Sequence, residues 1–174
     1  MRYAEVVIFE MLPKVGLYSI KYEGEDMNEA EKFFDRFGSD KSRQDQIKAF
    51  LNTLERMGKR GANDFYFDRH EGFIHALPSK EDTKLDLPKV KREYDFDLRL
   101  FWSKLSPSVV VLFNGGIKNS KELQYSPDLY PEPYNSAVKA AKALYEATKY
   151  NGEFYIDGKT IVSKSNDPIE ISFK

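Results

Sequence analysis

Cysteine is absent from the 174-residue sequence, and histidine occurs only as His70 and His75. A chain without cysteine forms no disulfide, no thiolate nucleophile and no cysteine-bound zinc or iron–sulfur centre. Two histidines are too few for a multi-histidine metal site. No apolar run approaches the roughly 20 residues that cross a bilayer, and the first residues show no apolar signal segment. We therefore expect a cytoplasmic protein without a cofactor or metal, and without membrane contact.

An excess of charge of either sign is also missing. The chain has 27 Lys and Arg against 28 Asp and Glu, a formal net charge of −1 and a pI of about 6.2. A uniformly basic nucleic-acid-binding domain typically has a pI above about 9. The balance is uneven along the chain, because residues 23–40 hold seven acids against two bases and residues 41–60 hold six bases against two acids. The basic segment either contacts phosphates or forms an ordinary solvated helix face.

Apolar periodicity predicts the secondary structure of most of the chain. Strands are predicted for residues 3–11, 17–22, 64–68, 72–77, 94–102, 109–113 and 169–173. Helices are predicted for residues 28–38, 42–59 and 134–149, the first of them capped by Asn28. Asp157-Gly158 between apolar runs predicts a hairpin over residues 153–163. Asn114-Gly115-Gly116 is expected to break the strand before it, and residues 120–133 to form a loop.

This order of elements predicts the fold class. Sequential hairpins with segregated helices indicate an α+β protein. We expect one domain over residues 1–174, with an antiparallel sheet, two N-terminal helices packed on it, a C-terminal helix and an added terminal hairpin. The terminal hairpin either covers a sheet edge or forms a surface for a partner.

Residue types alone give no strong catalytic fingerprint. Gly115-Gly116 lacks the consensus of a phosphate-binding loop. Asp95 and Asp97 lie two apart on a predicted strand, so they share one face, which is either solvated or functional. His75 is either a structural histidine or an acid–base group. A basic cluster just before the strand at Tyr94 is suited to phosphate contact, and it comprises Lys84, Lys89, Lys91 and Arg92.

Two strand segments carry a resemblance to a known family. Leu98-Arg99-Leu100-Phe101-Trp102 resembles a Tyr-Arg-Val-Phe-Tyr motif. Residues 111–120, VLFNGGIKNS, resemble Val-Leu-Leu-His-Gly-Phe-x-Lys-Lys-Ser. Together with the order of elements, these motifs resemble the RelE/ParE toxin superfamily, and within it the HigB-like, phage-derived branch. The resemblance covers about residues 15–148, and it implies a RelE-like domain extended by a C-terminal hairpin over residues 150–174.

The resemblance implies a ribosome-dependent mRNA endonuclease that is paired with an antitoxin. Such cleavage needs no metal, since the RNA 2′-OH attacks the adjacent phosphate while a base, an acid and cations assist. On this view Arg99 and Lys118 are the catalytic cations. The same resemblance implies that RNA is bound by Lys89, Lys91, Arg92, Tyr94, Trp102 and Lys121. Tyr94 and Trp102 would stack on bases, although both aromatic side chains equally suit a core.

The sequence also departs from the family at three positions. Pro78 stands where the branch has an arginine, Asn114 where it has a histidine, and Asn119 where it has a second lysine. An obvious general acid or base is therefore missing. The alternative hypothesis is a catalytically inactive module of the same fold that engages a protein partner or self-associates into a homo-oligomer. In that case Arg99 is a cross-strand ion-pair partner of Asp95 or Asp97.

Overall fold

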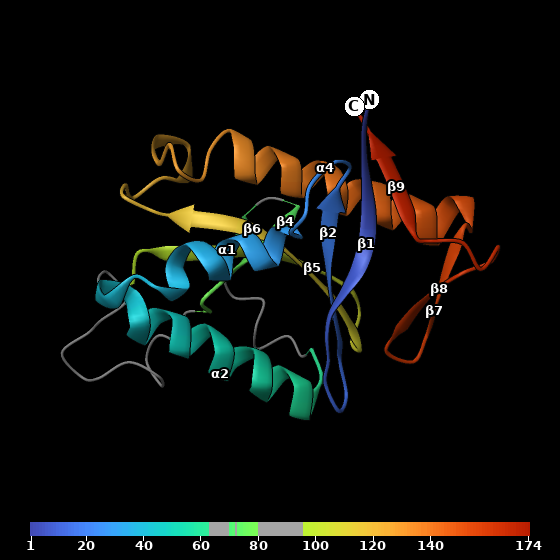
Figure 1. The fold of residues 1–174 in the computed structure, drawn as a ribbon, viewed down its shortest axis with the longest axis horizontal. Helices are drawn as coiled ribbons and strands as arrows, with labels where there is room; N and C mark the ends of the chain where they lie inside the picture. Colours follow the sequence, from blue (N-terminus) through green and yellow to red (C-terminus); the bar gives the residue numbers. More distant parts are fainter. Residues whose placement is uncertain (63–69, 72, 80–95) are drawn as a thin grey trace.

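The computed structural model describes residues 1–62, 70–71, 73–79 and 96–174, so the strand predicted for residues 64–68 lies outside the described part. The elements follow one another along the chain as in Figure 1. In order they are β1 (Arg2–Met11), β2 (Gly16–Tyr22), α1 (Glu29–Gly38), η1 (Lys41–Arg43), α2 (Gln44–Arg60), β3 (His70–Glu71), β4 (Ile74–Leu77), β5 (Leu98–Ser106), β6 (Val109–Ile117), η4 (Leu123–Tyr125), α4 (Glu132–Glu146), η5 (Ala147–Asn151), β7 (Phe154–Asp157), β8 (Thr160–Ser163) and β9 (Glu170–Phe173).

Seven strands form one sheet in the order β3-β4-β5-β6-β2-β1-β9, and β7 and β8 form a separate hairpin. The predicted α+β architecture is confirmed. Neighbouring strands are antiparallel except β2 and β6, which run parallel, so the expectation of a wholly antiparallel sheet is wrong for this pair. A hairpin turn forces its two strands to run in opposite directions, whereas the long connection from β2 to β6, which contains α1, α2 and strands β3 to β5, does not.

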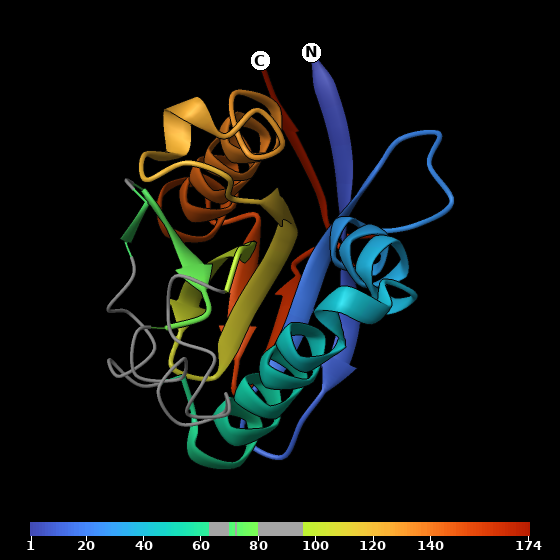
Figure 2. The same ribbon diagram turned by 90° about the vertical axis from the view of Figure 1, so that its left-hand side faces the viewer.

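Helices cover both faces of the sheet (Figure 2). One face packs against α1 and α2 through a cluster that includes Leu17, Phe33, Phe50, Leu100 and Trp102. The other face packs against α4 and the β7–β8 hairpin through a cluster that includes Tyr18, Phe101, Phe113, Leu144 and Ile161. A central strand that is buried on both faces reads as a continuous apolar run, which explains why residues 109–113 show no alternation.

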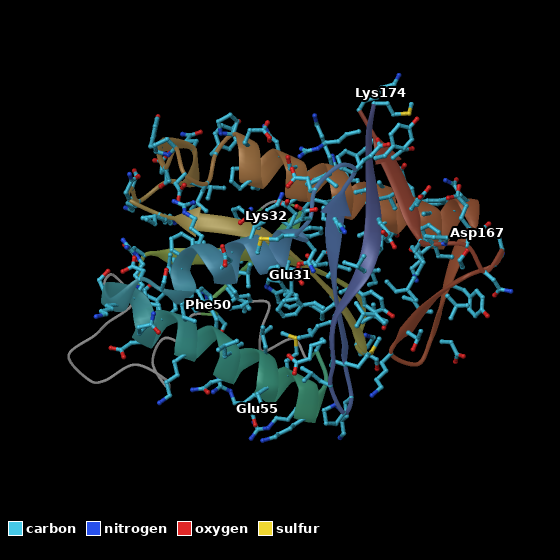
Figure 3. All side chains as sticks on the ribbon, viewed as in Figure 1. Glu31, Lys32, Phe50, Glu55, Asp167 and Lys174 are labelled. Atoms are coloured by element: carbon cyan, nitrogen blue, oxygen red, sulfur yellow. The ribbon has the colours of Figure 1, made fainter. Side chains whose placement is uncertain are left out.

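The two N-terminal helices form for the reasons that their sequences indicate. Asn28 Oδ1 accepts from the Glu31 amide at 2.9 Å and the Glu31 carboxylate accepts from the Asn28 amide at 2.9 Å, which confirms the predicted cap as a capping box. In α2 most of the apolar stripe is buried, with Leu51 exposed, so Phe50 faces the sheet while Glu55 lies on the outer side (Figure 3).

The strands that follow α4 have two different positions: β9 joins the sheet, and the β7–β8 hairpin packs on the face that α4 covers. The predicted last strand is confirmed as β9, which pairs with β1 from Arg2 to Glu5, so the two chain ends lie side by side in Figure 1. The predicted β7–β8 hairpin is also confirmed, and its turn uses Gly158 at φ 58, a left-handed conformation that suits glycine. The last strand β9, and not the β7–β8 hairpin, covers part of the outer edge of β1, since the hairpin forms a separate two-stranded sheet.

Two predicted boundaries are wrong around the β5–β6 hairpin. β5 continues to Ser106, and β6 runs through Asn114-Gly115-Gly116 to Ile117 instead of breaking there. The two glycines serve close packing. A Cβ added to Gly115 would lie 1.9 Å from the Arg99 carbonyl oxygen, and one added to Gly116 would lie 2.5 Å from an Asp128 carboxylate oxygen. Among the described residues, no helix is long and apolar enough to span a membrane.

Candidate functional site

Arg99 has a buried, structural position in β5. Its side chain is 6% exposed, and its Nη1 donates to the carbonyl oxygens of Phe96 at 2.7 Å and Leu98 at 2.8 Å. Arginine donors that hold backbone carbonyls in this way fix the local chain rather than face solvent. Nη1 is thus engaged with the backbone near the start of β5, and the role of Arg99 as a catalytic cation stays a prediction.

Of the residues expected to bind RNA, one is buried and four lie outside the described part of the chain. Trp102 is 0% exposed in the cluster under α1 and α2, and its ring lies 5.2 Å from that of His75 on β4. Base stacking by Trp102 is therefore excluded in this structure, since no face of the ring reaches the surface. Lys89, Lys91, Arg92 and Tyr94 lie outside the described residues.

Lys118 and Lys121 do come together, at a hollow where β6 ends. This β6-end hollow has a volume of about 440 Å³. It is lined by Lys118, Lys121, Glu122, Leu123, Gln124, Tyr130 and Tyr134. Tyr134 at the start of α4 contacts the rings of Phe101 and Tyr130, with centroid distances of 5.9 and 5.8 Å. The two lysines and the two tyrosines thus line one open hollow.

Asp128 fixes the loop that carries Lys121 and Tyr130. One oxygen of its carboxylate accepts from the Ile117 amide at 2.6 Å at the end of β6. The other oxygen accepts from Arg36 Nη1 of α1 at 2.9 Å. The space for this carboxylate exists because residue 116 has no side chain. Sequence reasoning missed Asp128, since one aspartate in a proline-rich loop carries no local signal of a contact eleven residues earlier.

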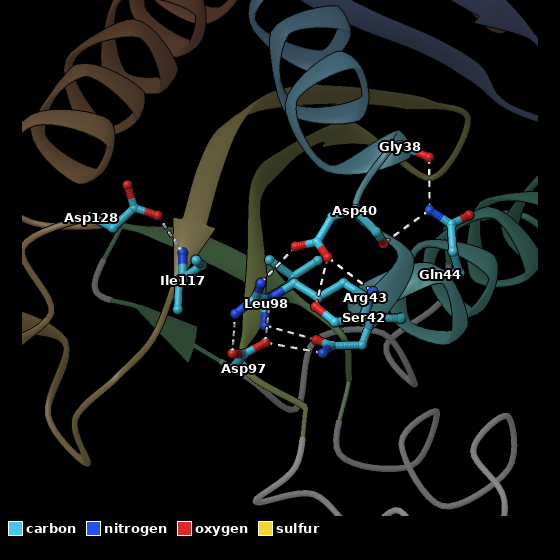
Figure 4. A network of polar contacts seen from close by, with 10 residues as sticks. Gly38, Asp40, Ser42, Arg43, Gln44, Asp97, Leu98, Ile117 and Asp128 are labelled. Atoms are coloured by element: carbon cyan, nitrogen blue, oxygen red, sulfur yellow. Dashed lines mark hydrogen bonds and ion pairs between the residues drawn. The ribbon is translucent and has the colours of Figure 1, made fainter.

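A polar network joins the start of β5 to the start of α2 (Figure 4). Arg43 donates to both carboxylate oxygens of Asp97, from Nε at 3.1 Å and from Nη2 at 2.9 Å, and Nη1 reaches Asp40 at 2.6 Å. Gln46 donates to Asp97 at 3.0 Å and accepts from the Leu98 amide at 2.9 Å. Asp97 thus pairs with Arg43 of the basic segment, whereas Asp95, the other partner suggested for Arg99, lies outside the described residues.

This network also decides how Asp97 responds to pH. Burial alone would raise the pKa of Asp97, but hydrogen bonds from Arg43 and Gln46 outweigh burial and lower the pKa below its usual range. A carboxyl group with a lowered pKa in the folded state stabilises the fold above its unfolded pKa, which is about 3.9 for aspartate. That stabilisation is lost as the pH falls through the folded pKa.

We expect Asp97→Asn to lower the free energy of unfolding at pH 7 by about 1–3 kcal/mol, because Arg43 loses its charged acceptor. Urea denaturation at pH 7 and at low pH checks this, with the difference between wild type and variant shrinking in acid. The control is Glu55→Gln, whose ion pair with Lys59 is 62% and 64% exposed and is worth less than about 1 kcal/mol. Equal effects of the two substitutions would contradict the role given to the network.

The β6-end hollow has the groups for phosphate chemistry but not the family's histidine. Asn114 stands where the family motif has the histidine, and its side-chain oxygen accepts from the Gly115 amide at 2.8 Å. The hollow does hold the Glu122 carboxylate, which can accept a proton, two ammonium groups, which balance phosphate charge, and two phenols, which can donate or stack. Among the described residues, no three His, Asp or Glu side chains are grouped as metal ligands.

No family model, curated protein or solved structure matches this chain.

Proposed function

We propose that this chain is a RelE/HigB-like toxin that cleaves mRNA on the ribosome and is paired with an antitoxin, with its reaction centre at the β6-end hollow. The observation that carries the proposal is that Lys118 and Lys121 line one open hollow together with Tyr130 and Tyr134. Lys118 belongs to the segment that resembles the toxin motif. The reaction centre is thus shifted away from buried Arg99, and the two lysines take over the stabilisation of the phosphate charge.

The proposed reaction uses the RNA's own 2′-oxygen. This oxygen attacks the adjacent phosphorus, its proton passes to a base, and the bond from phosphorus to the 5′-oxygen breaks as an acid protonates the leaving oxygen. The products are a 2′,3′-cyclic phosphate and a 5′-hydroxyl end. Glu122 is the candidate base, and Tyr130 or an ammonium group of the hollow is the candidate acid. The lysines neutralise the extra negative charge of the pentacoordinate phosphate.

We expect induction of the wild-type chain in a bacterial host to arrest growth, and ribosome-bound mRNA to be cut to cyclic-phosphate ends. Lys121→Gln should reduce cleavage about 10²-fold, as loss of one donor to a developing oxyanion does. Lys121 is exposed, so this variant keeps its fold. Lys139→Gln, at an exposed residue of α4 that is not among those lining the hollow, is the matched control and should cleave like wild type. Rates are measured by mapping mRNA ends in a purified translation reaction.

A second candidate function is the catalytically inactive binding module. Two observations favour it: Arg99 is bound to backbone carbonyls, and Asn114 stands where the family has a histidine. Its signature is a stable complex, either with the product of the adjacent reading frame or with a second copy, seen by sizing with light scattering, together with no growth arrest and no cleavage. Cleavage by a monomer, lost in Lys121→Gln and kept in Lys139→Gln, would overturn this second candidate.

A further inference from the structure

Most of the lining of the β6-end hollow comes from the loop between β6 and α4. Six of its seven lining residues lie between Lys118 and Tyr130, and the seventh, Tyr134, belongs to α4. Apart from the short η4, this loop has no regular secondary structure. A segment without a helix or a sheet ladder opens locally unless other contacts hold it. The positions of Lys121 and Tyr130 therefore depend on the contacts that hold the loop.

Ser126 joins the two sides of this loop. It is fully buried, and its hydroxyl accepts from the Ser120 amide at 3.2 Å, directly before Lys121. Its carbonyl accepts from the Leu129 amide at 2.9 Å and from the Tyr130 amide at 3.0 Å. The loop is therefore one folded unit that carries the lysine side and the tyrosine side of the hollow together. Its place on the sheet has to be fixed by other contacts.

Two anchors attach this unit to the sheet. Leu129 is fully buried in the cluster on the α4 face, but apolar burial is not directional. Asp128 supplies the direction, since one oxygen of its carboxylate accepts from the Ile117 amide at 2.6 Å (Figure 4). The other oxygen accepts from Arg36 Nη1 at 2.9 Å, in the last turn of α1. A Cβ on Gly116 would lie 2.5 Å from the first oxygen, so the carboxylate packs where residue 116 has no side chain.

Arg36 is itself held against α1. Its guanidinium carbon lies 4.6 Å from the centre of the Phe37 ring, and Phe37 is buried in the cluster beneath α1 and α2. Contact with a buried ring restricts the long arginine side chain, so the ion pair with Asp128 loses less side-chain entropy than a pair of free surface chains. The pair links α1 to the loop even though its side chains are 50% and 29% exposed.

We propose that Asp128 is a positioning residue of the β6-end hollow, and that Arg36 holds its carboxylate in the working orientation. Neither residue lines the hollow. Asp128 keeps the loop on β6 and thereby sets where the Lys121 ammonium and the Tyr130 phenol lie. A misplacement of about 1 Å, caused far from the reacting atoms, can slow a reaction about 10²-fold. The effect on cleavage rests on the proposed function, whereas the order of the loop does not.

Three variants separate the two bonds of Asp128. Asp128→Asn keeps an oxygen for the Ile117 amide but loses the charge that Arg36 binds, and Asp128→Ala loses both acceptors. In a purified translation reaction we expect kcat to fall about tenfold for Asp128→Asn and for Arg36→Gln, and about 10²-fold for Asp128→Ala. KM should change by less than about twofold, because the lysines keep their charge and lose only their alignment with the transition state. Glu55→Gln, in an exposed ion pair of α2, is the matched control and should cleave like wild type.

A double-mutant cycle with Lys121 distinguishes positioning from a general loss of stability. If Asp128 acts by placing Lys121, Asp128→Ala should slow cleavage by less than about threefold further in the Lys121→Gln background. A general loss of stability would instead multiply the effects of the two substitutions. Multiplied effects would overturn the proposal. Wild-type cleavage by Asp128→Ala, alongside lost cleavage in Lys121→Gln, would do the same.

Amide hydrogen exchange in the full chain tests the proposal without RNA. We expect the Ile117 and Tyr130 amides to exchange at least about tenfold faster in Asp128→Ala than in wild type, because the loop opens more often. Asp128→Asn should fall between the two, and the Ile20 amide of β2 should keep its protection. Unchanged exchange at Ile117 and Tyr130 would overturn the proposal. If the wild type cleaved no RNA while these amides lost protection in Asp128→Ala, the proposed function would be wrong and the positioning of the loop by Asp128 would stand.

Discussion

Trp102→Ala is expected to lower the free energy of unfolding by about 3–5 kcal/mol, which is typical of removing a buried tryptophan. Trp102 is fully buried between the sheet and the two N-terminal helices, in one cluster with Leu100 and Phe50. Domains of this size are typically stable by only about 5–15 kcal/mol, so the variant loses a large share of its stability. Urea denaturation followed by circular dichroism measures the loss.

The matched control for Trp102 is Tyr155→Ala in β7, where the side chain is 47% exposed. Its effect should stay within about 1 kcal/mol, as for most surface substitutions. Because Trp102 is the only tryptophan in the chain, its fluorescence also reports its burial through weak quenching by iodide. A stable Trp102→Ala variant that had lost only RNA binding would contradict the structure and restore the base-stacking role expected from the family motif.

The helices and hairpins are predictable because their signals are local. Asn28 and Glu31 lie within one turn, and Asp157-Gly158 sits between the two strands that it joins, so a short window of sequence contains each cause. The parallel pairing of β2 with β6 depends on a connection of more than eighty residues. No local pattern contains that information, and the sequence therefore predicted the elements better than the sheet.

The candidate site was harder to predict for the same reason. The family motif singled out Lys118, which directly follows β6, and Lys121 lines the same hollow. The motif could not reveal that Arg99 is bound to the carbonyls of Phe96 and Leu98, because alternation alone does not tell which face of a doubly covered sheet is open. Tyr130 and Tyr134 line the same hollow, and Asp128 ties their loop to α1 and β6 through contacts between separate segments, which no local pattern predicts.

Gly115→Ala is expected to destabilise the protein by about 3 kcal/mol, at the upper end of the usual cost of overpacking. The added Cβ would lie 1.9 Å from the Arg99 carbonyl oxygen and 2.9 Å from the Leu100 Cα. Both are backbone atoms of the paired strand, so no side chain can turn aside to make room. β5 and β6 would have to separate where Leu100 pairs with Gly115, one step from the pairing of Arg99 with Gly116.

Gly38→Ala should change the stability in the opposite direction when it is measured in the same assay. Gly38 ends α1, its φ is not positive, and nothing lies within 4 Å of an added Cβ. Alanine there should stabilise the protein by about 0.4–1 kcal/mol, because it restricts the unfolded chain without a clash. Thermal and urea midpoints of the two variants should therefore move in opposite directions from wild type. If Gly115→Ala moved with Gly38→Ala, the two strands would have to be farther apart than the structure places them. The strand break first expected at Asn114-Gly115-Gly116 would then be the better description.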